Sequence, residues 1–207
     1  MPNTDIYKTP HEIIGKLSEF GVTKKELIAV ALQAAAARNN TTPFHPINAP
    51  GTYSYMEGVA ALRAVFLTKE GWDMDRPSNI EAVTNKESNL TILFQNVDHA
   101  CGKSCPQAIS GKGEGTKKFI ENPTAYLFDY MTEEDQLKEN QNVWVLCVSS
   151  NGDELRAELS LPRSIEGQQF SSFKERIFII TGDEWGPDDA EAGLPDNQEF
   201  DIQITRK

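Results

Sequence analysis

The first seventy residues carry apolar side chains at the spacing of amphipathic helices. Apolar positions recur every three or four residues there, so they gather on one side of each helix. This pattern predicts three helices, over residues 11–20, 24–38 and 51–67. The second is the best defined, because Thr23 and Glu26 have the spacing of a capping box ahead of a run rich in Ala and Leu.

Beyond residue 71 the pattern changes to short runs of β-branched and aromatic residues, which are typical of strands. Two runs separated by a polar turn predict one hairpin, and two more that flank Asn151, Gly152 and Asp153 predict another. A further apolar run, over residues 171–181, and a segment of alternating apolar and polar residues, over 200–205, predict two more strands. In order, the predicted strands cover residues 80–84, 90–97, 143–149, 154–161, 171–181 and 200–205.

Helices that precede strands, without regular alternation of the two, indicate an α+β fold. We therefore expect N-terminal helices packed on a mainly antiparallel β-sheet, because consecutive hairpins generate antiparallel pairs. A length of 207 residues suits a single domain. Within it we distinguish a helical part over residues 1–70, a mainly β part over 71–182 and an acidic segment over 183–207.

Negative charge is concentrated near the end of the chain. The formal net charge is −11, and residues 183–201 contain eight acids and no Lys or Arg, so the remaining residues carry only −3. Proteins that bind nucleic acid normally present a basic face, so we do not expect nucleic acid as the main ligand. The acidic segment, with Asp188, Asp189 and Glu191 at its centre, suits a protein partner with a basic surface.

The sequence contains no signal for a membrane or for export. No stretch has the roughly 18 uninterrupted apolar residues that a membrane-spanning helix needs. The first residues lack the basic and apolar regions of an export signal. Three cysteines, an odd number, argue against a framework of disulfides. We therefore expect a cytoplasmic protein that does not bind a membrane.

The densest group of reactive side chains follows the strand predicted over residues 90–97. His99, Cys101 and Cys105 supply an imidazole and two thiols, which are ligands that zinc prefers, and they are our candidate zinc ligands. Dependable structural zinc sites have two separated ligand pairs, however, and this sequence has no second pair of cysteines. The alternatives are free thiols in a loop and a cysteine nucleophile with His99 as its base.

Acidic residues near the same loop suggest a second kind of site. Glu81, Asp98 and His99, with lysines of the following loop, resemble in kind the acid-and-lysine sets of metal-dependent nucleases. In such sets two carboxylates hold Mg²⁺ and a lysine polarises the attacking water. These residue types are common ones, so a chance arrangement is the alternative interpretation.

Residues 110–118 form a basic segment on an otherwise acidic chain, with three glycines among three lysines, Lys112, Lys117 and Lys118. Glycine lets backbone N–H groups converge on an anion, and lysine neutralises its charge. The segment therefore predicts a loop that contacts phosphate. A solvated surface loop is the alternative, because the pattern matches no specific phosphate-binding motif.

Six short segments carry a resemblance to other proteins, at residues 51–52, 58–63 (GVAALR), 80–83 (IEAV), 94–101 (FQNVDHAC), 111–118 (GKGEGTKK) and 173–177 (FKERI). In these segments the chain resembles uncharacterised small proteins of phages and other bacterial mobile elements. The resemblance covers about half of the chain, and it implies no activity. It does imply an accessory protein in the cytoplasm of a bacterium or of an infected host cell.

Together these features favour a non-enzymatic binding or accessory protein of a phage or mobile element. One such role is a counter-defence inhibitor that engages a basic host protein through an acidic face, and it needs no cofactor. The first alternative is a nuclease or phosphoesterase that depends on Mg²⁺ and is centred on Glu81, Asp98 and His99. The second is a structural zinc protein. Each of these roles requires a different set of side chains to converge.

Overall fold

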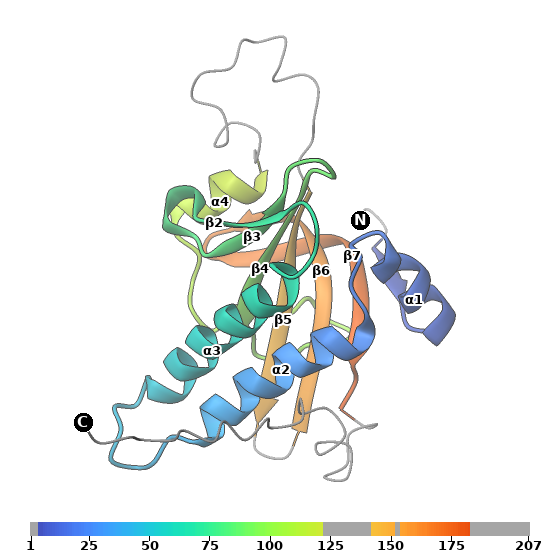
Figure 1. Ribbon diagram of the computed structural model, residues 1–207. Coiled ribbons are helices and arrows are strands. Elements are labelled where there is room, and N and C mark those ends of the chain that lie inside the picture. The colour runs from blue at the N-terminus through green and yellow to red at the C-terminus, as the bar shows by residue number, and fades with distance from the viewer. Residues whose placement is uncertain (1–3, 122–141, 152–153, 183–207) are drawn as a thin grey trace, which may run out of the picture.

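A computed structural model describes residues 4–121, 142–151 and 154–182 (Figure 1). Within these residues it confirms the α+β class, because helices α1, α2 and α3 pack on one sheet of seven strands. The helices are α1 (Pro10–Ser18), α2 (Lys24–Asn39), α3 (Ala49–Phe66), α4 (Glu114–Glu121) and the 3-10 turn Pro77–Asn79; the strands are β1 (Asp5–Tyr7), β2 (Trp72–Asp75), β3 (Ala82–Asn85), β4 (Leu90–Asn96), β5 (Asn142–Asn151), β6 (Glu154–Glu166) and β7 (Gln169–Ile180). None of the described helices combines the length and the apolar run needed to cross a bilayer.

The strand order is β1-β7-β6-β5-β4-β3-β2, so both predicted hairpins are present as antiparallel pairs, β3 with β4 and β5 with β6. Two pairs are parallel, β4 with β5 and β1 with β7. A parallel pair requires a crossover connection. The described part of the β4–β5 connection contains residues 97–113 and α4, which lie across the sheet from α2 and α3 (Figure 1).

The structure adds elements that the pattern did not predict. Strand β6 continues to Glu166 and pairs with β7 across a turn at Gly167, whose φ of +61° favours glycine. Strands β1 and β2 have three and four residues, which is too short for a recognisable alternation. Helix α4 begins within the glycine-rich segment that we predicted as a loop. The strand predicted over residues 200–205 lies outside the described residues.

Both faces of the central strands are covered, which explains why every residue of β4 is buried. Side chains alternate between the faces, so Ile92 and Phe94 join the core beneath the helices, whereas Leu93 joins the core on the second face. Helix α4, residues 97–113 and the far end of the β6–β7 hairpin cover that second face. The candidate site described below lies between these two layers.

Helix α3 approaches β4 closely because Gly58 has no side chain. A Cβ atom at that position would lie 2.3 Å from Cζ of Phe94, far inside van der Waals contact. Two hydrogen bonds strengthen the contact: the Ser54 hydroxyl donates to Oδ1 of Asn96 at 2.9 Å, and Asn96 Nδ2 donates to the carbonyl of Gly51 at 2.9 Å. Helix α3 is thereby fixed at the end of β4.

We predict that Gly58→Ala lowers the free energy of unfolding by about 1–3 kcal/mol, because the added methyl group displaces the Phe94 ring from a packed core. Gly15→Ala in α1 is the matched control, since a Cβ there meets nothing within 4 Å and alanine favours the helix by roughly 0.5–1 kcal/mol. Urea unfolding measures both changes. Equal effects of the two substitutions would contradict the close approach of α3 to β4.

Candidate functional site

A buried ion pair joins β6 and β7 on the second face of the sheet. Glu158 is 0% and Arg176 is 2% exposed. The guanidinium donates from Nη2 to Oε2 at 2.6 Å and from Nε to Oε1 at 2.9 Å, and the Ser160 hydroxyl donates to Oε1 at 2.8 Å. A buried pair offsets its desolvation only with such two-point geometry and additional hydrogen bonds. Arg176 is therefore a buried cation whose charge is fully matched.

The same ion pair holds the loop after β4 against the sheet. Arg176 Nη1 donates to the carbonyls of Gly102 and Ser104, at 3.0 and 3.3 Å, and Glu158 accepts from the backbone N–H of Cys101. The positive φ of Cys101, +58°, turns the chain at this point. The ion pair thus holds the loop through three of its backbone groups, the N–H of Cys101 and the carbonyls of Gly102 and Ser104.

The environment of Cys101 does not suit a reactive thiol. Its Sγ donates to the carbonyls of Ala157 and Ile180, at 3.1 and 3.2 Å. Burial, reinforced by the negative charge of Glu158, raises the pKa of this thiol to about 12. The thiolate is the form that attacks carbon or binds zinc, and it is scarce at neutral pH under these conditions. The geometry therefore gives the cysteine-nucleophile alternative no support.

The candidate zinc ligands His99, Cys101 and Cys105 do not form a ligand set in the part of the chain that the structure describes. No three or more His, Cys, Asp or Glu side chains of those residues are grouped so that they could hold a metal ion. Asp98 instead closes the turn, since its Oδ1 accepts from the backbone N–H groups of His99 at 2.6 Å and Gln107 at 2.7 Å. The second predicted metal set, which combines Asp98 and His99 with Glu81, is likewise not gathered.

Glu81 lies between two arginines. Its Oε1 accepts from Nε of Arg76 at 2.9 Å, and its Oε2 pairs with Nη2 of Arg63. Partial burial acts to raise the pKa of Glu81, but the hydrogen bonds from Arg63 and Arg76 outweigh it and lower that pKa. The carboxylate is therefore ionised and already paired at both oxygens, which leaves it poorly placed to hold Mg²⁺.

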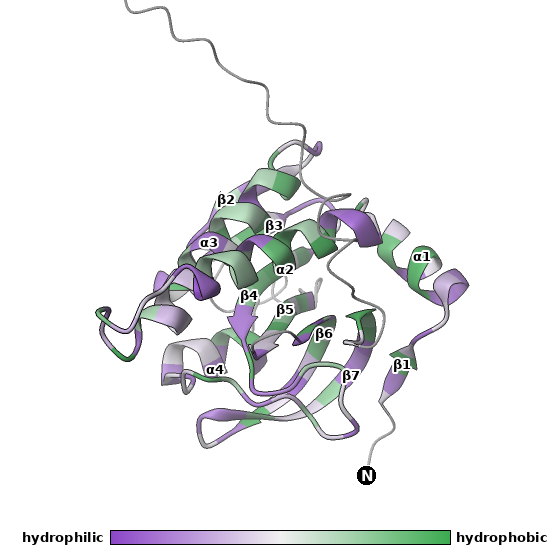
Figure 2. Cartoon of the chain, turned by 90° about the horizontal axis from the view of Figure 1, so that it is seen from below, coloured by the Kyte–Doolittle hydropathy of each residue, from purple (hydrophilic) through white to green (hydrophobic). Residues whose placement is uncertain are grey.

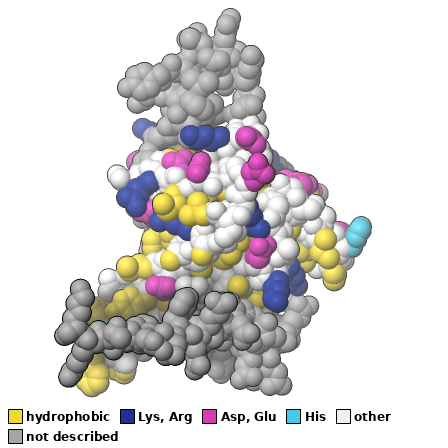
Figure 3. Space-filling model, viewed as in Figure 1, with side chains coloured by type: hydrophobic (Ala, Val, Ile, Leu, Met, Phe, Trp, Pro, Cys, Tyr) yellow, Lys and Arg dark blue, Asp and Glu magenta, His cyan; other side chains and the backbone are white. Residues whose placement is uncertain are grey.

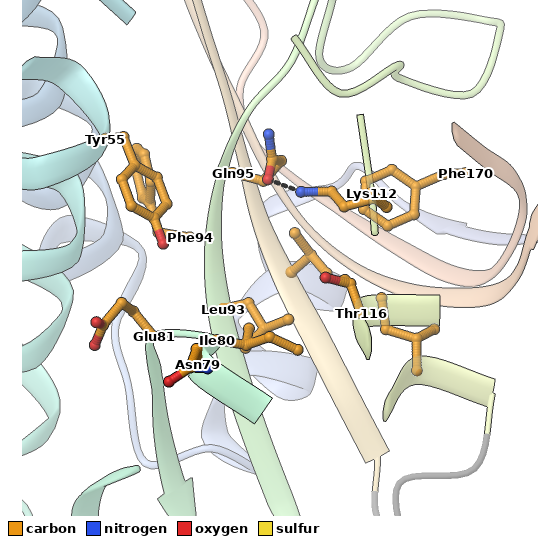
Figure 4. Close-up of a pocket in the computed structure, with 12 residues that line it drawn as sticks. Tyr55, Asn79, Ile80, Glu81, Leu93, Phe94, Gln95, Lys112, Thr116 and Phe170 are labelled. Carbon is orange, nitrogen blue, oxygen red and sulfur yellow. Dashed lines mark hydrogen bonds between the residues drawn. The ribbon is translucent and has the colours of Figure 1, made fainter. Parts of the chain in front are cut away.

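A pocket opens where β3 ends. The pairing of β3 with β4 stops at Ala82 opposite Leu93, and the next contact along this edge is the bridge from Val97 to Ala108. Between these points, α3 lies on one side of β4 and the α4 layer on the other (Figure 4). The pocket has a volume of about 140 Å³. A cavity of similar size, about 150 Å³, admits benzene.

The pocket is lined by both apolar and polar side chains, and slightly more of its exposed surface is polar than apolar. Its apolar surface comes from both layers and from the sheet, with Leu93, Phe94, Ile120, Val145 and Phe170 among the contributors. Figure 4 shows the side chains of Gln95, Lys112 and Thr116 on the α4 side and those of Tyr55 and Glu81 on the α3 side. Sites for small molecules combine apolar side chains with placed polar groups, and both kinds line this pocket.

Lys112 is the cation among the residues that line this pocket. Its Nζ donates to Oε1 of Gln95 and lies 5.7 Å from the centroid of the Phe170 ring. Gln95 is itself held in place, because its Nε2 donates to the carbonyl of Asn96 at 2.8 Å. No carboxylate of the described residues forms an ion pair with Lys112. Burial lowers the pKa of Lys112 to about 8, since little compensates the charged form.

Two exposed or partly exposed lysines follow Lys112 but do not share its environment. Lys117 and Lys118 lie in α4, and Lys118 is exposed. The backbone N–H of Lys112 donates to the carbonyl of Gln168 at 2.9 Å, which turns this lysine inward from the basic segment. The structure therefore separates the three lysines that we predicted to contact phosphate. The acidic residues Asp188, Asp189 and Glu191 lie outside the described residues.

Sequence reasoning overlooked Gln95, Glu158 and Arg176. A signal existed for Gln95, because a polar residue inside the apolar run of residues 92–97 indicates a buried polar group that needs a partner. Opposite charges inside two predicted strands, at Glu158 and Arg176, were a weaker signal of the same kind. Their pairing depends on the register of β6 and β7, which the pattern did not predict.

Comparison of this chain with protein-family models, with curated proteins and with solved structures gives no significant match. The geometry of the described residues is therefore what any statement about function rests on.

We predict that Glu158→Gln lowers the free energy of unfolding by about 3–5 kcal/mol, because it leaves the buried Arg176 charge without its counter-ion. The double variant Glu158→Gln with Arg176→Met should recover most of this loss, since it removes both charges. Urea unfolding at pH 7 provides the measurement. A double variant as unstable as the single one would show that the pair matters through its shape and not through its charge.

Lys112→Met should have the opposite effect and raise the free energy of unfolding at pH 7. The folded-state pKa of about 8 lies below the ordinary 10.5, so the unfolded chain binds the proton more tightly and wild-type stability rises with pH between these values. Below pH 8 the free energy of unfolding of the variant should exceed that of wild type by roughly 3 kcal/mol. This difference should vanish by about pH 10.5. Unfolding of both proteins at pH 7 to 10 tests this, and a difference independent of pH would contradict the lowered pKa.

Proposed function

We propose that this chain is a binding protein for a small organic anion and that Lys112 holds the anionic group beside Gln95. The observation that carries the proposal is a partly buried cation without a carboxylate partner among the described residues, in a pocket of about 140 Å³. Burying a cation destabilises a protein unless an anion or a sufficient set of acceptors compensates it. A bound anion supplies that compensation.

The comparison with Arg176 supports this interpretation. Arg176 lies on the same face of the sheet and has a carboxylate at two-point distance and two backbone carbonyls. Lys112 has one amide oxygen and the face of an aromatic ring. The same layer therefore contains one cation that stabilises the fold and one that is left for a ligand. Groups that lower stability are commonly those that function requires.

The chemistry of the pocket limits the class of anion. The Glu81 carboxylate also lines the pocket but is paired with Arg63 and Arg76, so Lys112 is the one charge there that is open to an anion. One such cation matches a single negative charge, so a monocarboxylate fits better than a phosphate dianion. The apolar side chains of the lining, which include Leu93, Phe94 and Phe170, suit a hydrocarbon or aromatic body attached to that group. The volume allows a body of about the size of benzene. A small aromatic or branched carboxylic acid meets all three conditions.

This proposal keeps the class of function that the sequence favours, a binding protein that needs no cofactor, and names a different binding surface. Engagement of a basic host protein through Asp188, Asp189 and Glu191 stays a prediction, because those residues lie outside the described part of the chain. The metal-dependent alternatives lack a gathered ligand set within the described residues. A small-anion site has a specific observation in its favour, and those alternatives do not.

Benzoate provides the test. We predict that it binds to wild-type protein and that Lys112→Met weakens its binding at least tenfold, because the variant lacks the cation. Benzamide, which has the same shape without the charge, should bind at least tenfold more weakly than benzoate. Lys118→Met is the matched control, since it removes an exposed lysine of α4 and should leave benzoate binding unchanged. Chemical-shift titration measures the affinity of wild type for benzoate and for benzamide, and the affinity of each of the two variants for benzoate.

The affinity for benzoate should also depend on pH in a defined direction. Only protonated Lys112 attracts the carboxylate, so the affinity should be constant below pH 8 and fall by up to tenfold per pH unit above it. Equal binding of benzoate and benzamide, or binding by Lys112→Met as tight as by wild type, would remove the proposal.

A further inference from the structure

The outer face of the α2–α3 helical pair is unusually free of charge. Residues 27–37 of α2 contain no charged residue, and Glu57 is the one charged residue in residues 49–62 of α3. Figure 2 shows green and pale stretches in both helices, with the hydrophilic residues in purple. A surface helix normally turns a polar face to water, and a helix that is apolar all round is normally covered on both sides. The sheet covers only one side of this pair.

A groove on this outer face lies near the α2–α3 loop. It has a volume of about 450 Å³ and is mainly apolar, and the side chains that line it include Gln33, Ala36, Ala37, Tyr53, Met56 and Glu57. The alanines leave room between the helices, whereas Tyr53 and Met56 project and are exposed. Figure 3 shows apolar side chains on the described part of this view, with acidic and basic side chains among them.

The loop between α2 and α3 presents two apolar side chains, Phe44 and Ile47, that are fully exposed. Its backbone is held by local contacts: the N–H of Thr42 donates to Nδ1 of His45 at 3.0 Å, and the N–H of His45 donates to the carbonyl of Thr42 at 3.0 Å. The His45 ring also packs edge-on against Tyr53, with centroids 5.6 Å apart. A side chain presented by a preorganised loop loses little entropy on binding.

The charges at this end of the helical pair favour a second copy of the chain as the partner. Within the described part of the chain Arg38 forms no ion pair, and neither does Glu57, whose Oε2 accepts from a neutral amide, Nε2 of Gln33, at 3.0 Å. A uniformly basic or acidic partner would match one of these charges and repel the other. A second copy related by a two-fold axis offers a glutamate to the arginine and an arginine to the glutamate, because such an interface uses the same patch on both subunits.

We propose that two copies of this chain associate through their α2–α3 faces, with Phe44 and Ile47 of each copy seated on the groove of the other. The patch holds both the projecting apolar side chains and the groove that receives such side chains, which is what a self-complementary interface requires. Few charged residues lie in residues 27–37 and 49–62, so little charge is brought together when two copies meet there. The Lys112 pocket lies outside this interface.

Sedimentation velocity of the full chain from 1 to 100 µM tests the proposal. Wild type is expected to be a dimer, and Met56→Glu is expected to weaken dimerisation at least 30-fold, because it buries a carboxylate in the apolar groove. Met74→Glu on β2 is the matched control, since Met56 and Met74 are 59% and 61% exposed and neither substitution should disturb folding. Wild type that is monomeric at 100 µM, or a Met56→Glu variant that dimerises like wild type, overturns the proposal.

A photo-crosslinking amino acid at position 44 identifies what lies on the groove. Crosslinks between two chains, from position 44 to the α2–α3 face, are the expected result. Crosslinks within one chain, from position 44 to residues 183–207, would show that the chain covers its own groove and would overturn the proposal.

Discussion

The second face of the sheet is organised by the need to compensate buried positive charge. Arg176 meets this need within the fold, because Glu158 pairs with it at two points and the same carboxylate fixes the loop at Cys101. Removing that carboxylate would leave a cation in an apolar layer, which a domain of marginal stability tolerates poorly. Lys112 lies in the same layer without a carboxylate from the described residues, and its lowered pKa reflects that lack. The proposed function follows from the difference between these two cations.

Topology explains why the unmatched cation lies in a pocket. Strand β3 is short and leaves the end of β4 unpaired along one edge, so α3 and the α4 layer approach each other across Phe94 and Gln95. The absence of a side chain at Gly58 brings α3 close to this edge, and the parallel pairing of β4 with β5 sends the connecting chain, with Lys112, over the opposite face. The site therefore lies between two layers of secondary structure. The α4 layer contributes Lys112 and Thr116, and α3 contributes Tyr55.

Local pattern predicted the elements whose signal is local. Helix α2 and its capping box at Thr23 and Glu26 are confirmed, as are the two hairpins, because periodicity and turn residues act over a few positions. The pattern could not distinguish Lys112 from the two lysines that follow it, since the contacts of Lys112 are with Gln95 and Phe170, which are distant in the sequence. It also placed emphasis on reactive residue types at Asp98 to Cys105, where the structure uses the side chains of Asp98 and Cys101 for hydrogen bonds to the backbone. Function is hardest to predict from sequence where the folded surroundings of a common residue change its pKa or its exposure.

The ionisation of Lys112 tests the central claim most directly. A heteronuclear magnetic resonance titration of the lysine side-chain signals, assigned with Lys112→Met, measures the pKa of this one amine in the folded protein. The account predicts a midpoint near 8, and a higher midpoint when saturating benzoate is bound, because the carboxylate stabilises the charged form. A midpoint near the ordinary 10.5 without ligand would contradict it, since it would mean that the charge of Lys112 is already compensated within the protein.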